Sequence, residues 1–141
     1  MTLNKPVFFE RRSTLRYRIN LPAELVLEDG TVLPVDATDI SNKGLQFRCD
    51  SWAAEEIEPR GIQSLPLDQI SLKIVADLPG MGEPDSRLYA RCRLIVVRRV
   101  SQNEYILGVE FIDFEKGSDR LLEQFIRQCE GKYQRKETSY R

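Results

Sequence analysis

Arginines cluster near the N-terminus of the chain. Arg11, Arg12, Arg16 and Arg18 lie within eight residues of one another. A guanidinium group is flat, permanently charged and forked, so it can bind phosphate oxygens or the O6/N7 edge of guanine through two hydrogen bonds. Arginine at this density favours a compact anion that carries bases over diffuse charge attraction. A solvated basic arm or an RNA-touching tail is the alternative that the arginines alone leave open.

A second polar motif follows after the length of one predicted hairpin and contains Asp39, Ser41 and Gly44. A carboxylate can accept hydrogen bonds from the N1–H and N2–H₂ groups of guanine, and a serine hydroxyl can donate or accept. A glycine lets the backbone approach a ligand closely. The same residue types also form self-bonded turns between strands, so the motif alone leaves a purely structural turn open.

Length and composition place the chain among globular domains. Its 141 residues suffice for one domain with one modest core, and 41% of them are hydrophobic and 30% charged. No apolar stretch approaches the roughly 18 residues that cross a bilayer, and no signal-peptide pattern follows Met1. We therefore expect no membrane insertion and a cytoplasmic location.

The residue types needed for catalysis or metal binding are scarce. The sequence contains no histidine, the commonest general base and zinc ligand. Cys49, Cys92 and Cys129 are odd in number and lie in apolar patterns, which favours small buried side chains over a disulfide framework. No nucleophile–base pair or phosphate-cradling glycine loop is recognisable. The expectation is a protein that is not an enzyme and has no metal or cofactor.

Alternating apolar and polar residues predict six short strands. Asp29 and Gly30 form a dipeptide typical of tight hairpin turns. On the fifth strand, Leu94 and Val96 are expected on the same face. The region 50–69 is interpreted as a connector with one short helical turn, in which Trp52 partly covers the core; a contact of Trp52 with a partner is the alternative. The predicted strands are 21–28, 31–38, 45–49, 70–78, 87–100 and 105–112.

The periodicity changes to that of a helix from Ser118, which is the expected N-cap. Gly131 either ends this helix or weakens it. The predicted fold class is mainly β: a small six-stranded antiparallel β-barrel with a C-terminal amphipathic α-helix and a flexible N-terminal arm. The predicted divisions are an arginine-rich arm over 1–18, the barrel and helix over 19–133, and a frayed basic tail over 134–141.

Taken together, the motifs resemble those of the PilZ domain family. The resemblance rests on Arg12 and Arg16 in an Arg-x-x-x-Arg motif, on Asp39–Gly44 in an Asp-x-Ser-x-x-Gly motif, and on the later segment Gly108–Phe111. It covers the chain from about Arg11 to Cys129. Each motif is weak alone, but the order and spacing of the three are specific.

The resemblance implies a six-stranded β-barrel that binds cyclic di-GMP without turning it over. It implies that Arg12 and Arg16 contact phosphates and guanine edges, that Asp39 and Ser41 contact a guanine base, and that Gly44 shapes the turn. The arm would wrap the ligand, and its ordering would change the surface that a protein partner meets. Family outputs include motility, surface polysaccharide synthesis and biofilm formation.

The residue before the first motif arginine influences ligand stoichiometry in the family. Here it is Arg11, which resembles members that take an intercalated dimer of the ligand. Two alternatives stay open: a scaffold of the type IV pilus kind that does not bind nucleotide, and a small nucleic-acid-binding barrel that uses the basic arm. The acidic body of the chain argues against a broad nucleic-acid-binding face, so we expect no nucleic-acid partner.

Overall fold

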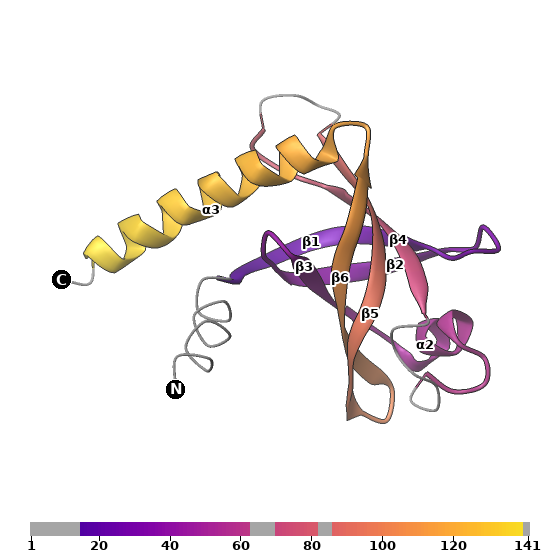
Figure 1. Cartoon of the computed structure of the whole chain (residues 1–141). Helices are drawn as coiled ribbons and strands as arrows, with labels where there is room; N and C mark the ends of the chain where they lie inside the picture. Colours follow the sequence, from indigo (N-terminus) through magenta and orange to yellow (C-terminus); the bar gives the residue numbers. More distant parts are fainter. Residues whose placement is uncertain (1–14, 63–69, 82–85, 140–141) are drawn as a thin grey trace, which may run out of the picture.

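A computed structural model describes residues 15–62, 70–81 and 86–139 of the chain, without the side chains of 132–139. The described residues form six strands and two helices (Figure 1). Their bounds are β1 Tyr17–Val26, β2 Val32–Ile40, β3 Gly44–Cys49, α2 Ser51–Ile57, β4 Ser71–Asp77, β5 Arg87–Ser101, β6 Glu104–Glu115 and α3 Ser118–Ser139.

The strands form a closed antiparallel barrel in the order β1-β2-β3-β6-β5-β4, which confirms the predicted fold class. Pairing of β1 with β4 closes the ring, for example through Leu25 and Ile74. Because β1 begins at Tyr17, which is buried, the last two residues assigned to the arm belong to the barrel. Apolar side chains that alternate along the strands point inward and fill the barrel. The most deeply buried of them are Leu25, Leu33, Ile40, Phe47, Ile74, Leu88, Leu94 and Leu107.

The three cysteines form no disulfide with one another, as predicted from their apolar surroundings. Cys49 and Cys92 are buried in the barrel, and Cys129 on α3 is partly buried. Burial raises the pKa of Cys49 and of Cys92 to about 12, so both thiols stay protonated at neutral pH. These two side chains therefore act as small hydrophobic core residues.

The two helices lie at opposite ends of the β5–β6 hairpin (Figure 1). Helix α2 is the short helix expected in the connector, and the Asp50 carboxylate caps it by accepting from Ala53 N–H. The expected position of Trp52 was wrong. Helix α2 turns Ala53 and Ala54 toward the core, which leaves the Trp52 side chain 58% exposed.

Helix α3 begins at Ser118 and continues through Gly131 to Ser139, so Gly131 does not end it. Ser118 differs from a conventional N-cap: its Oγ is buried and accepts a hydrogen bond from Tyr89 N–H at 2.8 Å. Ser118 thus ties the start of the helix to β5. Leu122 and Phe125 are buried on its inner face. None of the described helices is both long enough and apolar enough to cross a bilayer.

One predicted strand face was also wrong. A β-bulge lies between Leu94, opposite Val109, and Val96, opposite Gly108. The extra residue, Ile95, shifts the alternation by one position. Val96 therefore points outward and is 40% exposed, although Leu94 is fully buried.

Candidate functional site

The two motifs that the sequence analysis singled out meet on the outer surface of the barrel. Arg16 immediately precedes β1, and Asp39 lies near the end of β2, which pairs with β1. The pairing of Arg18 with Asp39 sets the register at this point. It brings Arg16 Nη1 to 3.9 Å from Asp39 Oδ1. The structure therefore joins the end of the arginine segment to the carboxylate, as the account from sequence required.

Gln46 connects the two charged side chains. It lies on β3 directly opposite Asp39. In the amide orientation that satisfies both neighbours, Gln46 Nε2 donates to Asp39 Oδ2 at 3.0 Å and Gln46 Oε1 accepts from Arg16 Nη1 at 3.0 Å. We call Arg16, Asp39 and Gln46 the polar cluster.

The Arg16–Asp39 contact is too long for a hydrogen bond, which spans about 2.7–3.2 Å between heavy atoms. The Arg16 side chain is 52% exposed and that of Asp39 is 24% exposed. Both groups are thus accessible, and the guanidinium makes no hydrogen bond to Asp39 Oδ1. The polar cluster offers a fork of N–H donors beside a carboxylate acceptor on one surface.

Burial sets the ionisation of Asp39. Removal of the carboxylate from water raises the pKa of Asp39. The positive charges of Arg16 and Arg18 and a hydrogen bond with the Gln46 backbone oppose this shift only in part. A carboxylate that is incompletely compensated gains from a ligand that donates hydrogen bonds to it. The N1–H and N2–H₂ groups of guanine provide two such donors.

Ser41 and Gly44 build the turn that ends β2. Ser41 is buried, and its Oγ accepts from Lys43 N–H at 3.1 Å and from Gly44 N–H at 3.2 Å. Its backbone N–H donates to Gly44 O at 2.9 Å. The self-bonded turn left open by the sequence is thus present. In this state the Ser41 hydroxyl serves the turn, and its contact with a guanine stays a prediction.

Gly44 is required by close packing. A Cβ at this position would lie 2.1 Å from the backbone oxygen of Val109 on β6. Only glycine lets β3 approach β6 this closely. The motif glycine therefore fixes β3 against β6 and, through β3, positions Gln46 beside Asp39.

Arg11 and Arg12 lie outside the described residues, so their predicted roles stay predictions. Gln46 was not among the residues predicted for the site. A two-residue loop between Ser41 and Gly44 pairs Ile40 with Leu45 and Asp39 with Gln46, so the turn motif already contained this information. Gly108 lies opposite Gln46 and leaves the surface beside it free of a side chain. A Cβ at Gly108 would lie 3.3 Å from Val96.

Solved structures share this fold. E. coli YcgR in complex with c-di-GMP aligns at a TM-score of 0.62 and 16% identity, over 93% of this chain and 51% of that one. The K. pneumonia MrkH–c-di-GMP complex aligns at a TM-score of 0.64 and 19% identity, over 89% of this chain and 55% of that one. The Bacillus subtilis inhibitor of motility, MotI/DgrA, aligns at a TM-score of 0.62 and 16% identity, over 86% of this chain and 53% of that one. The chain therefore spans about half the length of these relatives.

The match to a single domain is more complete. The PilZ domain of E. coli YcgR, solved with c-di-GMP, is covered over 98% of its length by 91% of this chain, at a TM-score of 0.61 and 16% identity. A search of the curated proteins gives no match. The family profile described as "PilZ domain" matches residues 10–128, which include both motifs, the whole barrel and the first half of α3. The chain belongs to the PilZ domain family.

Proposed function

We propose that this protein is a non-enzymatic receptor for cyclic di-GMP. The observation that carries the proposal is the meeting of Arg16 and Asp39 on the barrel surface, at the junction of the two family motifs. Cyclic di-GMP has two phosphates and two guanines, so it calls for several guanidinium groups and for an acceptor at a guanine edge. The polar cluster supplies one of each from adjacent positions.

The arginine segment would complete the site. Arg12 lies one Arg-x-x-x-Arg interval before Arg16. We propose that Arg12 and Arg16 bind phosphate oxygens and guanine edges, that Asp39 and Ser41 receive a guanine base, and that Arg11 favours an intercalated pair of ligand molecules. Ordering of the segment around the ligand then remakes the surface seen by a protein partner.

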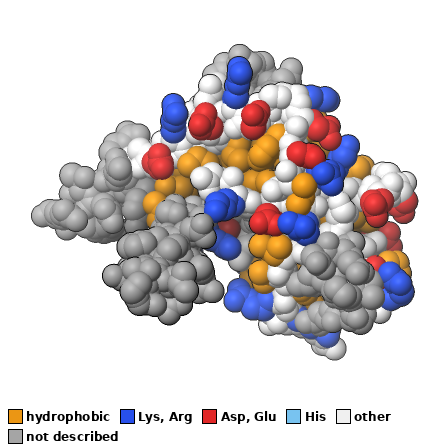
Figure 2. Space-filling model, viewed as in Figure 1, with side chains coloured by type: hydrophobic (Ala, Val, Ile, Leu, Met, Phe, Trp, Pro, Cys, Tyr) orange, Lys and Arg blue, Asp and Glu red, His pale blue; other side chains and the backbone are white. Residues whose placement is uncertain are grey.

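Charge distribution favours a local anion site over a nucleic-acid interface. The whole chain has a formal net charge of −1. On the face shown in Figure 2, the described acidic and basic side chains are interspersed and form no continuous basic area. Binding of long nucleic acids depends on such an area. YcgR and MrkH are both known as complexes with c-di-GMP, which supports the same ligand here.

A calorimetric titration of the full chain with cyclic di-GMP tests the proposal. We expect micromolar or tighter binding, and a loss of at least about tenfold for Arg12→Ala or Arg16→Ala, because a hydrogen bond to a charged group is worth roughly 1.5–3 kcal/mol. The ligand-to-protein ratio tests the role of Arg11, with two ligands per protomer as the expected value.

Arg87→Ala is a matched control, because Arg87 is also half-exposed and is paired with Asp77 at 2.9 Å on a remote part of the barrel. It should bind as the wild type does. Absence of both heat and a thermal shift with the wild-type chain would discard the proposal and would favour a scaffold that keeps the fold without the nucleotide.

A further inference from the structure

Trp52 is exposed beside a groove that shares no lining residue with the polar cluster. It is the single tryptophan of the chain. Helix α2 presents it to solvent because the next two residues, Ala53 and Ala54, occupy the core. Exposed aromatic side chains beside a concave surface are typical anchors of protein–protein contacts. The groove therefore offers a second candidate binding surface.

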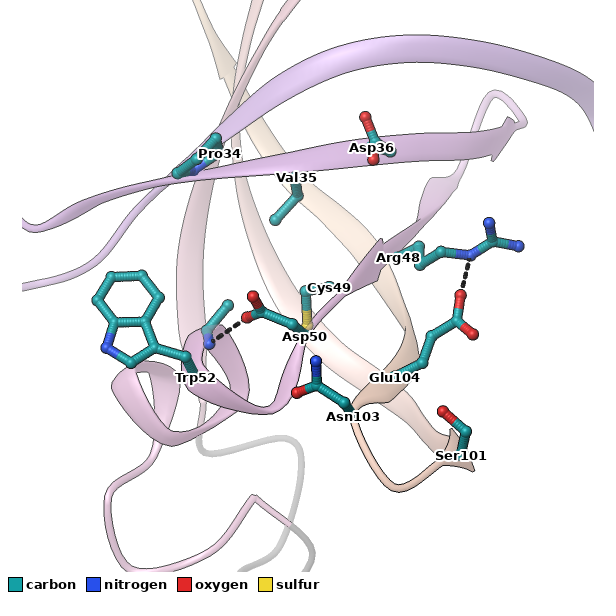
Figure 3. A pocket seen from close by; sticks show the side chains of 11 residues that line it. Pro34, Val35, Asp36, Arg48, Cys49, Asp50, Trp52, Ser101, Asn103 and Glu104 are labelled. Atoms are coloured by element: carbon teal, nitrogen blue, oxygen red, sulfur yellow. Dashed lines mark hydrogen bonds and ion pairs between the residues drawn. The ribbon is translucent and has the colours of Figure 1, made fainter.

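The groove has a volume of about 580 Å³ and is bounded by β2, α2 and the turn between β5 and β6. Figure 3 shows the indole of Trp52 on one side and the ion pair of Arg48 with Glu104 on the other. Asp36 on β2 lies above the groove in this view. Its lining thus combines one large aromatic surface with several charged groups.

Hydrogen bonds fix the two walls relative to each other. Asn103 Oδ1, in the β5–β6 turn, accepts from Ser51 N–H at 3.2 Å and from the Ser51 hydroxyl at 2.5 Å. Asp50 Oδ1 accepts from Ala53 N–H at 2.8 Å. The two bonds to Asn103 tie the start of α2 to the hairpin, and the Asp50 bond caps the helix itself. The groove therefore exists before any partner binds, and little ordering is needed.

The charge of the lining selects the kind of partner. Asp36, Asp50 and Glu104 oppose the single cation Arg48, which gives the groove a net formal charge of −2. Arg48 Nε is already paired with Glu104 Oε2 at 2.7 Å. An incoming cation therefore meets two further carboxylates, and an anion is repelled.

We propose that this groove docks a cationic segment of a partner protein, with an arginine stacked on Trp52 and directed at the carboxylates of Asp36 and Asp50. Arginine fits better than lysine because its flat guanidinium stacks on an indole and forms two hydrogen bonds with a carboxylate. The groove shares no lining residue with the polar cluster, so the inference does not depend on cyclic di-GMP binding.

Fluorescence of the full chain tests the inference, because all tryptophan emission comes from Trp52. The probe is a capped pentapeptide in which two arginines flank a leucine, titrated at low ionic strength. We expect a saturable change in emission that weakens as salt is added. The same peptide with glutamates in place of the arginines should give none.

Charge reversal separates this groove from general attraction. Asp36→Lys should lower the affinity for the arginine peptide by at least about fivefold, because it places a like charge against the incoming cation. Glu123→Lys makes the same change of net charge on α3, at the other end of the molecule (Figure 1), and should leave binding unchanged. Circular dichroism confirms that both variants are folded.

Three outcomes would overturn the proposal: no saturable signal, an equal response to the glutamate peptide, or equal losses in the two variants. Emission that changes with protein concentration alone, with a dimer in sedimentation, would assign the groove to a second copy of the chain instead. Trp52→Ala should leave the calorimetric titration with cyclic di-GMP unchanged, which keeps a failure here distinct from a failure of the receptor proposal.

Discussion

Two parts of the barrel exterior use the same residue types differently. Along β4, β5 and β6, which we call the ion-pair ladder, Arg91 contacts Asp113 at 2.6 Å, Arg93 contacts Glu110 at 2.9 Å, and Lys73 contacts Glu115 at 3.0 Å. In the polar cluster, Arg16 and Asp39 stay 3.9 Å apart. The charges of the ladder pair directly, whereas those of the polar cluster are joined only through Gln46.

The pKa values of the carboxylates in the two regions are shifted in opposite directions. A hydrogen bond from Arg91 lowers the pKa of Asp113, whereas burial raises the pKa of Asp39 despite the nearby arginines. A satisfied surface pair has little to gain from a ligand, but an incompletely satisfied carboxylate does. The two regions therefore differ in the distance between partners more than in residue types, and this difference underlies the proposal that the polar cluster binds a ligand.

The largest expected effect separates the regions by ligand affinity. Arg16→Ala should lower the affinity for cyclic di-GMP at least about tenfold, which is the loss expected for a charged hydrogen bond to the ligand. Arg93→Ala removes an arginine of similar exposure from the ladder and should change affinity less than about twofold, because its guanidinium is already paired with Glu110 at 2.9 Å. Parallel calorimetric titrations measure both. Similar losses in the two variants would erase the distinction.

The second effect concerns the glycine that positions the polar cluster. Gly44→Ala places a Cβ against the oxygen of Val109 and should lower the free energy of unfolding by about 1–3 kcal/mol, as overpacking does. Gly131→Ala, on α3 with open space around it, should instead raise it by roughly 0.5–1 kcal/mol through helix propensity. Urea denaturation measures both. A Gly44→Ala chain as stable as the wild type would show that β3 and β6 do not need this contact.

The third effect is a pH dependence of binding. In the proposed complex a guanine edge donates to the ionised form of Asp39, and burial raises the pKa of Asp39 above its ordinary value. Affinity should therefore hold at neutral pH and fall as pH drops through that pKa, at a higher pH than for an exposed aspartate, by up to about tenfold per pH unit below it.

Titrations between neutral pH and the acid limit of the folded state measure this dependence. Asp39→Asn is the control, because an amide does not titrate in this range. It should bind more weakly than the wild type at neutral pH, with an affinity that hardly changes with pH. A wild-type affinity that is flat with pH would indicate that Asp39 does not contact the ligand as a carboxylate.

The smallest effect is on the stability of the ladder. Arg91→Ala should lower the free energy of unfolding by no more than about 1 kcal/mol, because half-exposed ion pairs contribute little in water. Any loss should shrink as salt is added. Thermal unfolding at two ionic strengths measures this effect. A loss well above this limit would show that the ladder stabilises the barrel as a network.

Alternation of apolar residues was sufficient to predict the barrel. Each of the six predicted strands overlaps a strand of the barrel, and the helix follows, but β1 begins at Tyr17, four residues before the predicted start. The failures have local causes. Val96 was misassigned because the bulge at Ile95 leaves no distinct pattern in an apolar run. Trp52 was misassigned because two alanines of α2 fill the core in its place, which composition does not reveal.

The candidate site was only partly predictable. Arg16 and Asp39 were recognisable by their types, but their adjacency depends on the register of β1 with β2. Gln46 was overlooked because a glutamine on an exposed strand face carries no signal of its own. The length of the loop between Ser41 and Gly44 determines which residue of β3 pairs with Asp39. Hairpin geometry applied to the motif would therefore have identified Gln46.

Mapping of amide chemical shifts on addition of cyclic di-GMP tests the central claim most directly, because it shows whether the ligand binds at the polar cluster or at the ion-pair ladder. We expect the largest changes at Arg16, at Asp39–Gln46 and at Gly108, with little change along Arg91 and Asp113. Changes that centre on the ion-pair ladder, or none at ligand concentrations well above those of the protein, would contradict the account.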